Sequence, residues 1–185
     1  MIRLSKEMQG TILDIGGGGE GIIGRLYKNQ VVAIDNCQEE LDEAPDCFEK
    51  VRMDAESLAY QGETFDNITF FYSFMFMNLD TQKQALSEAV RVLKTGGTLH
   101  IWDTEIASAY PEPFCVDLDI CLNNEELIHT TFGIISDVKN QTAETFLSIC
   151  SEYHLIVKKE EMENGHFYLV FQKVGGSQVD TPPFD

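Results

Sequence analysis

The sequence predicts a doubly wound α/β fold, in which a mostly parallel sheet of seven strands carries helices on both faces. Between residues 11 and 102, short apolar runs of strand length alternate with segments of helical periodicity. Such alternation is typical of parallel strands joined by right-handed crossover helices. Residues 31–34 are apolar throughout, which suits a strand that is buried on both faces. Two later stretches with a period of two residues predict antiparallel hairpins.

Local patterns give the individual elements. Thr81-x-x-Gln84 has the form of a capping box, and apolar residues recur at helical spacing from Leu86 to Leu93. The pair of glycines that follows is expected to end this helix. The expected strands are residues 11–15, 31–34, 48–53, 65–72, 98–102, 155–162 and 166–173, and the expected helices are 21–27, 38–44, 81–93 and 142–153.

Two β-hairpins complete the expected structure. Apolar and polar side chains alternate on both sides of a polar turn at residues 123–126, which predicts a hairpin inserted after strand five, within about residues 105–140. Its apolar face must cover either the domain's own cleft or a second subunit in a homodimer. Asn164-Gly165 is a strong turn signal and predicts an antiparallel C-terminal hairpin. We expect residues 1–174 to form a single domain and residues 175–185 to form a flexible tail.

The chain of 185 residues has 31 acidic and 13 basic side chains, so its net charge is −18. Such a surface repels phosphate backbones and anionic lipids, which argues against nucleic-acid and membrane partners. Eleven acidic and two basic residues fall between Asp35 and Asp66, a run that fits a solvated acidic face better than a docking patch for a cation. The five cysteines form no Cys-x-x-Cys pair, and no signal peptide is recognised. A cytoplasmic protein with free thiols and no metal site is therefore expected.

Residues 12–24 hold the clearest functional signal. An apolar strand ends at Asp14-Ile15, four glycines follow, and a helix-compatible segment begins near Glu20. Glycine can take a positive φ and lets another molecule approach the bare main chain, while the start of a helix offers free N–H groups. The segment predicts a loop that holds a polar cofactor; the alternative is a tight turn that binds nothing.

Carboxylates follow the next two strands. Parallel α/β sheets bind ligands outside the carboxyl ends of their strands, where the strand order reverses. Asp35 stands at such an end, nineteen residues after Gly16, and can accept hydrogen bonds from both hydroxyls of a ribose. Asp54 could accept from an exocyclic amine. Gly16-x-Gly18-x-x-Gly21 also matches the dinucleotide fingerprint, so these residues by themselves leave NAD open as the cofactor.

Segments further along the chain decide between the cofactors. The segments concerned are 12–24, Val32-Ala33-Ile34-Asp35, Asp54-Ala55-Glu56-Ser57-Leu58, Phe65-Asp66-Asn67-Ile68 and Val92-Leu93-Lys94-Thr95-Gly96-Gly97-Thr98-Leu99. In this order they resemble a class I S-adenosylmethionine-dependent methyltransferase of the small-molecule type, whose fold is Rossmann-like. The resemblance covers about residues 11–103, and the final helix and hairpin fit the same fold.

The resemblance implies a set of residues that bind S-adenosylmethionine. They are Asp14, Gly16, Gly17, Gly18, Gly19, Asp35, Asn36, Asp54, Ala55, Phe71 and Tyr72. The four glycines would line the methionine part of the cofactor, and Asp14 would steady their loop. Asp35 would hold the ribose, and the residues around Asp54 would meet the adenine. The backbone at the end of the fourth strand would face the amino group and the methyl.

The reaction implied by the resemblance is in-line displacement that transfers a methyl group to a small-molecule acceptor. Phe74-Met75-Phe76-Met77 stands where relatives often have His, and an apolar cleft wall suits a small organic acceptor. No catalytic base is assigned. The candidates near the cleft are Tyr72, Asp103 and Tyr110, each of which also has a structural explanation. The alternatives are an NAD-dependent oxidoreductase and a non-catalytic protein that keeps the cofactor-binding fold.

Overall fold

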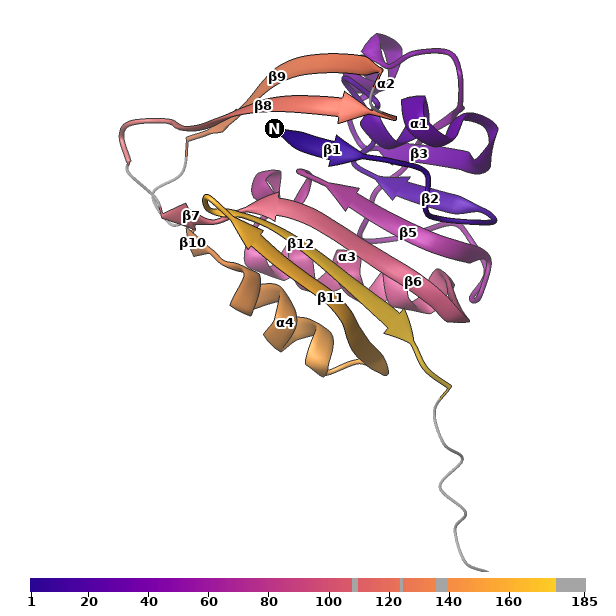
Figure 1. Ribbon diagram of the computed structural model, residues 1–185. Helices are drawn as coiled ribbons and strands as arrows, with labels where there is room; N and C mark the ends of the chain where they lie inside the picture. The colour runs from indigo at the N-terminus through magenta and orange to yellow at the C-terminus, as the bar shows by residue number, and fades with distance from the viewer. Residues whose placement is uncertain (108–109, 124, 136–139, 176–185) are drawn as a thin grey trace, which may run out of the picture.

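A computed structural model describes residues 1–107, 110–123, 125–135 and 140–175 of the chain (Figure 1). Its α-helices are α1 (Ile22–Tyr27), α2 (Gln38–Glu43), α3 (Leu79–Val92) and α4 (Ala143–Ser151). Its strands are β1 (Ile2–Leu4), β2 (Ile12–Ile15), β3 (Val31–Asp35), β4 (Glu49–Arg52), β5 (Phe65–Phe71), β6 (Leu93–Thr104), β7 (Ile106–Ala107), β8 (Phe114–Leu122), β9 (Glu126–Ile134), β10 (Asn140–Gln141), β11 (Leu155–Glu163) and β12 (His166–Lys173). The short 3-10 helices η1 (Lys28–Gln30) and η2 (Phe74–Phe76) complete the set.

The central sheet has seven strands in the order β11-β12-β6-β5-β2-β3-β4. Neighbouring strands from β6 to β4 are parallel, and β12 is antiparallel to both β6 and β11. The doubly wound, mostly parallel sheet and its antiparallel C-terminal hairpin are therefore confirmed. The strand order reverses at β2, because β3 lies on one side of it and β5 on the other. The four glycines follow β2 directly, so they lie at the position where this class of sheet binds its ligands.

Each face of the sheet has its own apolar core. Figure 1 shows the helices and the hairpin that lie over the sheet. On one face, side chains of β5, β6 and β12 pack against α3 and α4, with Phe70, Leu86 and Phe146 fully buried. On the other face, α1 and the hairpin of β8 and β9 cover β2, β3 and the end of β5, and Ile12 and Ile120 are fully buried there. The alternation of inward and outward side chains along each strand produces these two separate cores.

The hairpin expected after strand five is confirmed as β8 and β9, which pair in register from Phe114↔Ile134 to Leu122↔Glu126. Its apolar face belongs to the same core as α1, so it covers the domain that carries it. A homodimer through this hairpin stays a prediction, and it would need the polar face that bears Asp117, Asp119 and His129. The sequence did not suggest β1, whose three residues pair in parallel with β8. A strand this short has no recognisable periodicity by itself.

Two boundaries around α3 differ from the expectation. The capping box at Thr81 is wrong as a helix start, because α3 begins at Leu79 and Asn78 caps it by accepting a hydrogen bond from the Thr81 N–H at 2.9 Å. The helix also ends earlier, at Val92, and extended chain begins before the Gly96-Gly97 pair rather than after it. The tail expected at residues 175–185 lies almost wholly outside the described residues.

Replacing the capping residue of α3 tests this assignment. Asn78→Ala removes the side-chain acceptor for a free helix N–H, and we expect it to lower the free energy of unfolding by about 1 kcal/mol. Thr81→Ala leaves that acceptor in place and serves as the matched variant, with an expected change within about 0.5 kcal/mol. Urea unfolding followed by circular dichroism measures both. If Thr81→Ala lowers the free energy of unfolding more than Asn78→Ala does, the capping box predicted from the sequence would be supported instead.

Candidate functional site

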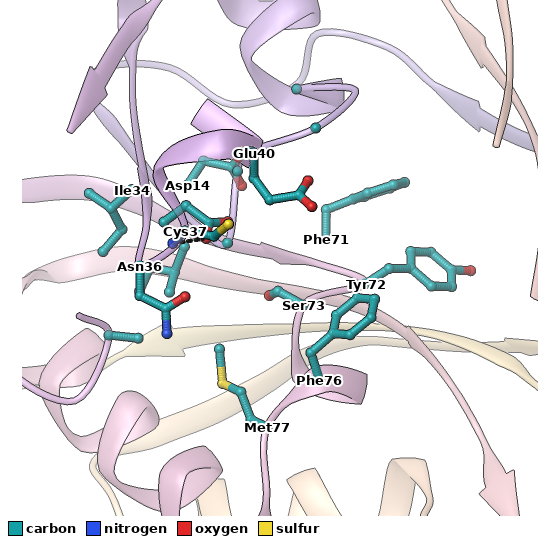
Figure 2. Close-up of a pocket in the computed structure, with 18 of the residues that line it drawn as sticks. Asp14, Ile34, Asn36, Cys37, Glu40, Phe71, Tyr72, Ser73, Phe76 and Met77 are labelled. Atoms are coloured by element: carbon teal, nitrogen blue, oxygen red, sulfur yellow. Dashed lines mark hydrogen bonds between the residues drawn. The ribbon is translucent and has the colours of Figure 1, made fainter. Parts of the chain in front are cut away.

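A cavity of about 960 Å³ opens at the carboxyl ends of β2, β3, β4 and β5 (Figure 2). The loops after these four strands form most of its wall, and residues 131–133 of β9 close it from the hairpin side. The cavity is lined by all eleven residues expected to bind the cofactor: Asp14, Gly16, Gly17, Gly18, Gly19, Asp35, Asn36, Asp54, Ala55, Phe71 and Tyr72. The fold therefore brings them together, and the individual roles given to them stay predictions.

The glycine loop is held by main-chain hydrogen bonds to two neighbouring elements. The N–H groups of Gly16 and Gly17 donate to the Ile34 carbonyl at 2.8 and 3.1 Å, and Gly19 N–H donates to the Glu40 carbonyl at 2.8 Å. Gly16 and Gly19 have positive φ values of 75° and 58°. Glycine takes such angles without strain, so the chain can turn here and remain bonded to β3 and α2.

Protein side chains fill the space next to these glycines. A Cβ at Gly16 would collide with Ser73, and one at Gly17 would meet the Asp14 carboxylate. A Cβ at Gly18 would lie 2.6 Å from that of Glu40. The absence of side chains thus lets Asp14, Ser73 and Glu40 approach the loop. A bulky residue at Gly18 would also displace α2, so it would not be a clean probe of ligand binding.

Asp14 is the most strongly perturbed group at the site. Its side chain is 2% exposed, and the Thr69 hydroxyl donates to Oδ1 at 2.6 Å. Burial raises the pKa of Asp14 to about 7, the nearby Asp35 carboxylate adds to the increase, and the bond from Thr69 opposes it. Near neutral pH this carboxyl is therefore divided between its protonated and ionised forms. It lies against Gly17, and its role in steadying the loop stays a prediction.

The two carboxylates at the strand ends are oriented by their own loops. Asp35 Oδ1 accepts a hydrogen bond from the Cys37 N–H at 2.9 Å, and Asp54 Oδ1 accepts one from the Glu56 N–H at 2.9 Å. These bonds fix each side chain at the rim, and Asp35 Oδ2 lies toward Gly18. Both carboxylates are thus preorganised acceptors on adjacent loops of the cavity.

Tyr72 lines the cavity with its ring but directs its hydroxyl elsewhere. The residue has a φ of 52°, and its ring stacks on Phe132 at a centroid distance of 5.8 Å. The hydroxyl is 2.8 Å from His166 Nδ1, and in Figure 2 it points away from Ser73 and Asp14. It lies beside a second cavity, of about 600 Å³, formed between β1, β6 and β12. Burial raises the pKa of Tyr72 above its usual range, so its hydroxyl does not supply a base at neutral pH.

The other two catalytic candidates do not line the cavity. Asp103 is fully buried and accepts hydrogen bonds from the Met75 N–H at 3.3 Å, the Thr104 N–H at 2.8 Å and Gln141 Nε2 at 2.8 Å. It therefore anchors the segment that follows β5. Tyr110 is 61% exposed and is not among the residues around the cavity.

Several lining residues were not named as site residues from the sequence, among them Glu20, Glu40, Ser73 and Phe132. Ser73 is 6% exposed, and its Oγ has no hydrogen-bond partner within the described part of the chain. Its position directly after a strand end was a usable signal. Glu40 belongs to the acidic run that was interpreted as a solvated face. The sequence offered nothing to place Phe132 at the cavity, because that depends on how the hairpin folds back.

Polar contacts hold the hairpin over the cavity. The Thr130 hydroxyl donates to Glu20 Oε1, which joins β9 to the end of the glycine loop. Arg25 Nη1 pairs with Glu126 Oε1 at 3.0 Å, and Arg25 Nε donates to the Glu20 carbonyl at 2.6 Å. These bonds join the end of the glycine loop to the middle of β9 and α1 to its first residue, so Phe132 is held at the mouth of the cavity.

The fold and the glycine-lined cavity define an α/β protein with a ligand-sized cavity at the switch point of its sheet. Residues 13–101 match a family model described as a methyltransferase domain. Over this stretch the chain carries an S-adenosylmethionine-dependent methyltransferase domain. This match favours S-adenosylmethionine over NAD as the cofactor. No curated protein matches the sequence significantly.

Solved structures with low sequence identity share the fold. An S-adenosylmethionine-dependent methyltransferase of Clostridium acetobutylicum is 15% identical, with a TM-score of 0.62 over 90% of this chain and 85% of that one. CalS10, an amino pentose methyltransferase of Micromonospora echinaspora, is 13% identical, with a TM-score of 0.62 over 89% and 84%. The cyclase SpnF is 17% identical, with a TM-score of 0.62 over 91% and 78%. The fold is therefore shared by proteins whose reactions differ, and the site must specify the chemistry.

The raised pKa of Asp14 has a consequence for stability. Its pKa is about 7 in the folded protein against 3.8 in the unfolded chain, so the folded state holds the extra proton between these values. The free energy of unfolding should therefore fall as the pH rises from about 4 to about 7, by up to about 4 kcal/mol from this group. In Asp14→Asn this part of the slope is lost. Urea unfolding at several pH values measures the difference.

Asp66→Asn is the control for this measurement. Hydrogen bonds from Lys94 and Thr11 lower the pKa of Asp66 to about 2, so its contribution to stability is lost only at acidic pH. Above pH about 5 that variant should differ from the wild type by a constant amount. Equal pH slopes in wild type and Asp14→Asn would contradict the pKa assigned to Asp14.

Proposed function

We propose that this chain transfers a methyl group from S-adenosylmethionine to a small-molecule acceptor in the 960 Å³ cavity. The observation that carries the proposal is that one cavity joins the glycine loop and the acidic strand ends to an apolar end formed by Phe76, Met77 and Phe132. Small-molecule sites occupy roughly 300–1,000 Å³, so the volume is at the upper end of the range and suits a cofactor together with an acceptor.

The residues of the cavity fit the cofactor. A carboxylate fixed at the end of β3 is suited to a ribose, and Asp54 with Ala55 after β4 is suited to an adenine edge. The unpartnered Ser73 hydroxyl and the loop Gly16–Gly19 lie between them and the apolar end, where the methionine part would be held. The acidic lining suits a ligand with positive charge.

The bound cofactor supplies an electrophilic methyl group on a sulfonium. The protein's contribution is then to orient the acceptor and exclude water, and positioning of this kind can account for about 7 kcal/mol or more of the barrier. The hairpin, fixed by Arg25 and Thr130, supplies Phe132 to the apolar end. Tyr72 stacks on Phe132 and keeps that wall in place. Among the three catalytic candidates, the geometry supports none as a base toward an acceptor in this cavity.

Several observations favour a small acceptor over a macromolecule. The net charge of −18 opposes binding to nucleic acids. No helix in the described ranges has the length and apolar character needed to cross a bilayer. CalS10, which shares the fold, is named as an amino pentose methyltransferase. All five cysteines are free, which suits the reducing interior of a cell and supports the proposed cytoplasmic location.

Calorimetric titration with S-adenosylmethionine tests the cofactor assignment. We expect saturable binding to the wild type and weaker binding to Asp35→Ala, by about 1–3 kcal/mol, because hydrogen bonds to a charged acceptor are lost. Asp42→Ala removes a carboxylate of α2 that does not line the cavity and should bind as the wild type does. NAD should not bind. Binding of NAD in place of S-adenosylmethionine, or equal affinity in Asp35→Ala and Asp42→Ala, would refute the assignment.

A further inference from the structure

The cavity carries far more negative charge than its proposed cofactor can balance. Its lining includes the carboxyl groups of Asp14, Glu20, Asp35, Glu40, Glu43, Asp54 and Glu56. Arg25 is the one lining residue with a permanent positive charge, and its guanidinium is already paired with Glu126. S-adenosylmethionine has two positive groups and one negative group, so it adds a single net positive charge. Even with Asp14 partly protonated, several carboxylates remain uncompensated after cofactor binding.

We propose that the methyl acceptor is a small organic amine with an apolar substituent, bound as its ammonium form between this acidic wall and the aromatic end of the cavity. The inference rests on the proposed function and specifies its substrate class. A carboxylate or phosphate acceptor would add charge of the same sign as the wall, and like charges at short range are unfavourable. A cation relieves that repulsion.

The aromatic end provides a matching surface. The Phe132 ring lies 5.8 Å from the Tyr72 ring at an interplanar angle of 29°, and 6.3 Å from the Phe76 ring at 88°. Phe71 meets Tyr72 edge-on at 5.1 Å. Phe76 is 58% exposed although it is large and apolar, so this wall is open to an incoming molecule. Aromatic faces attract an ammonium group and also pack against an apolar substituent.

Ser73 gives an independent indication that a ligand group belongs at this position. Its Oγ is buried and without a hydrogen-bond partner in the described ranges, and Figure 2 shows it directed into the space between Asn36, Glu40 and Phe76. A buried hydroxyl left without a partner is unfavourable, so a native site is expected to satisfy it. An N–H group of the cofactor or of the acceptor would do so.

Glu40 is the carboxylate best placed to recognise the ammonium. In Figure 2 its side chain extends from α2 over the cavity, toward Phe71 and above Ser73. Partial burial and the carboxylates of Asp35, Glu43 and Glu20 raise the pKa of Glu40. A carboxylate with a raised pKa is a better hydrogen-bond acceptor for an ammonium and a better proton acceptor.

The chemical step balances with these groups. The ammonium gives one proton to Glu40, which passes it to water, and the neutral amine is left with a free electron pair. This pair forms the new N–C bond to the methyl, while the electron pair of the C–S bond stays on sulfur. The products are a methylated ammonium and the neutral thioether S-adenosylhomocysteine. No oxidant or further reactant is required.

Three probes that share a phenethyl group test the acceptor class: phenethylamine, phenethyl alcohol and hydrocinnamate. Each is incubated with the full chain and S-adenosylmethionine, and formation of S-adenosylhomocysteine is measured. We expect kcat/KM for the amine to exceed that for the alcohol by at least about tenfold, and no turnover of the carboxylate. Calorimetric titration of each probe into the complex with S-adenosylhomocysteine gives a second measurement, which does not depend on turnover.

A pair of variants on α2 separates recognition from general charge effects. Glu40→Gln should raise KM for phenethylamine about tenfold, by more than it raises the Kd of S-adenosylmethionine, because a hydrogen bond between charged groups is lost. Glu39→Gln makes the same change in net charge on the adjacent residue, which does not line the cavity, and should leave both constants unchanged.

The outcomes distinguish this inference from the function on which it rests. If S-adenosylmethionine binds and the alcohol or the carboxylate is methylated as well as the amine, the acceptor class is wrong and the methyltransferase function stands. Binding of S-adenosylmethionine with neither binding nor methylation of phenethylamine also overturns the inference. If S-adenosylmethionine does not bind, the proposed function fails and the inference fails with it.

Discussion

The site depends on the close approach of the main chain after β2 to three side chains, one from β2 itself, one from the segment after β5 and one from α2. Asp14, Ser73 and Glu40 all occupy space that a Cβ on the glycine loop would need. Because Gly16 and Gly17 donate to β3 and Gly19 donates to α2, the loop ties together the two strands and the helix that form the cavity wall. The glycines therefore first permit close contacts within the protein, and the shape of the cavity follows from those contacts.

Electrostatics is the second constraint on this site. Placing many carboxylates around one cavity is unfavourable in the free protein. Burial is the main cause of the raised pKa values of Asp14 and Glu40, and neighbouring carboxylates raise both further. A ligand with positive charge offsets the unfavourable charge, so the same carboxylates that weaken the free protein select for a cationic ligand. Stability and ligand preference are thus coupled through a small number of side chains, a pattern common at functional sites.

The hairpin β8–β9 lies outside the seven-stranded sheet and contributes to the cavity wall. It covers the same face as α1 and brings Phe132 to the mouth of the cavity, where Tyr72 and Phe76 meet it. Since the fold is shared with proteins of different activities, an element of this kind can set the acceptor. The contacts that hold it, through Arg25 and Thr130, are polar and partly exposed, whereas its apolar face is part of the core.

The sequence alone determined the seven-stranded sheet, the glycine loop, the acidic strand ends and the hairpin turns, because each depends on local periodicity or on residues with special backbone preferences. The sequence misplaced the start of α3, because Thr81 and Asn78 are both residues that can cap a helix N-terminus. Only the three-dimensional structure shows that Asn78 is the cap. Only the tertiary structure decided that Glu40 and Phe132 line the cavity, and that the Tyr72 hydroxyl turns away from it. Those facts depend on contacts between elements far apart in the chain, and local pattern carries no information about such contacts.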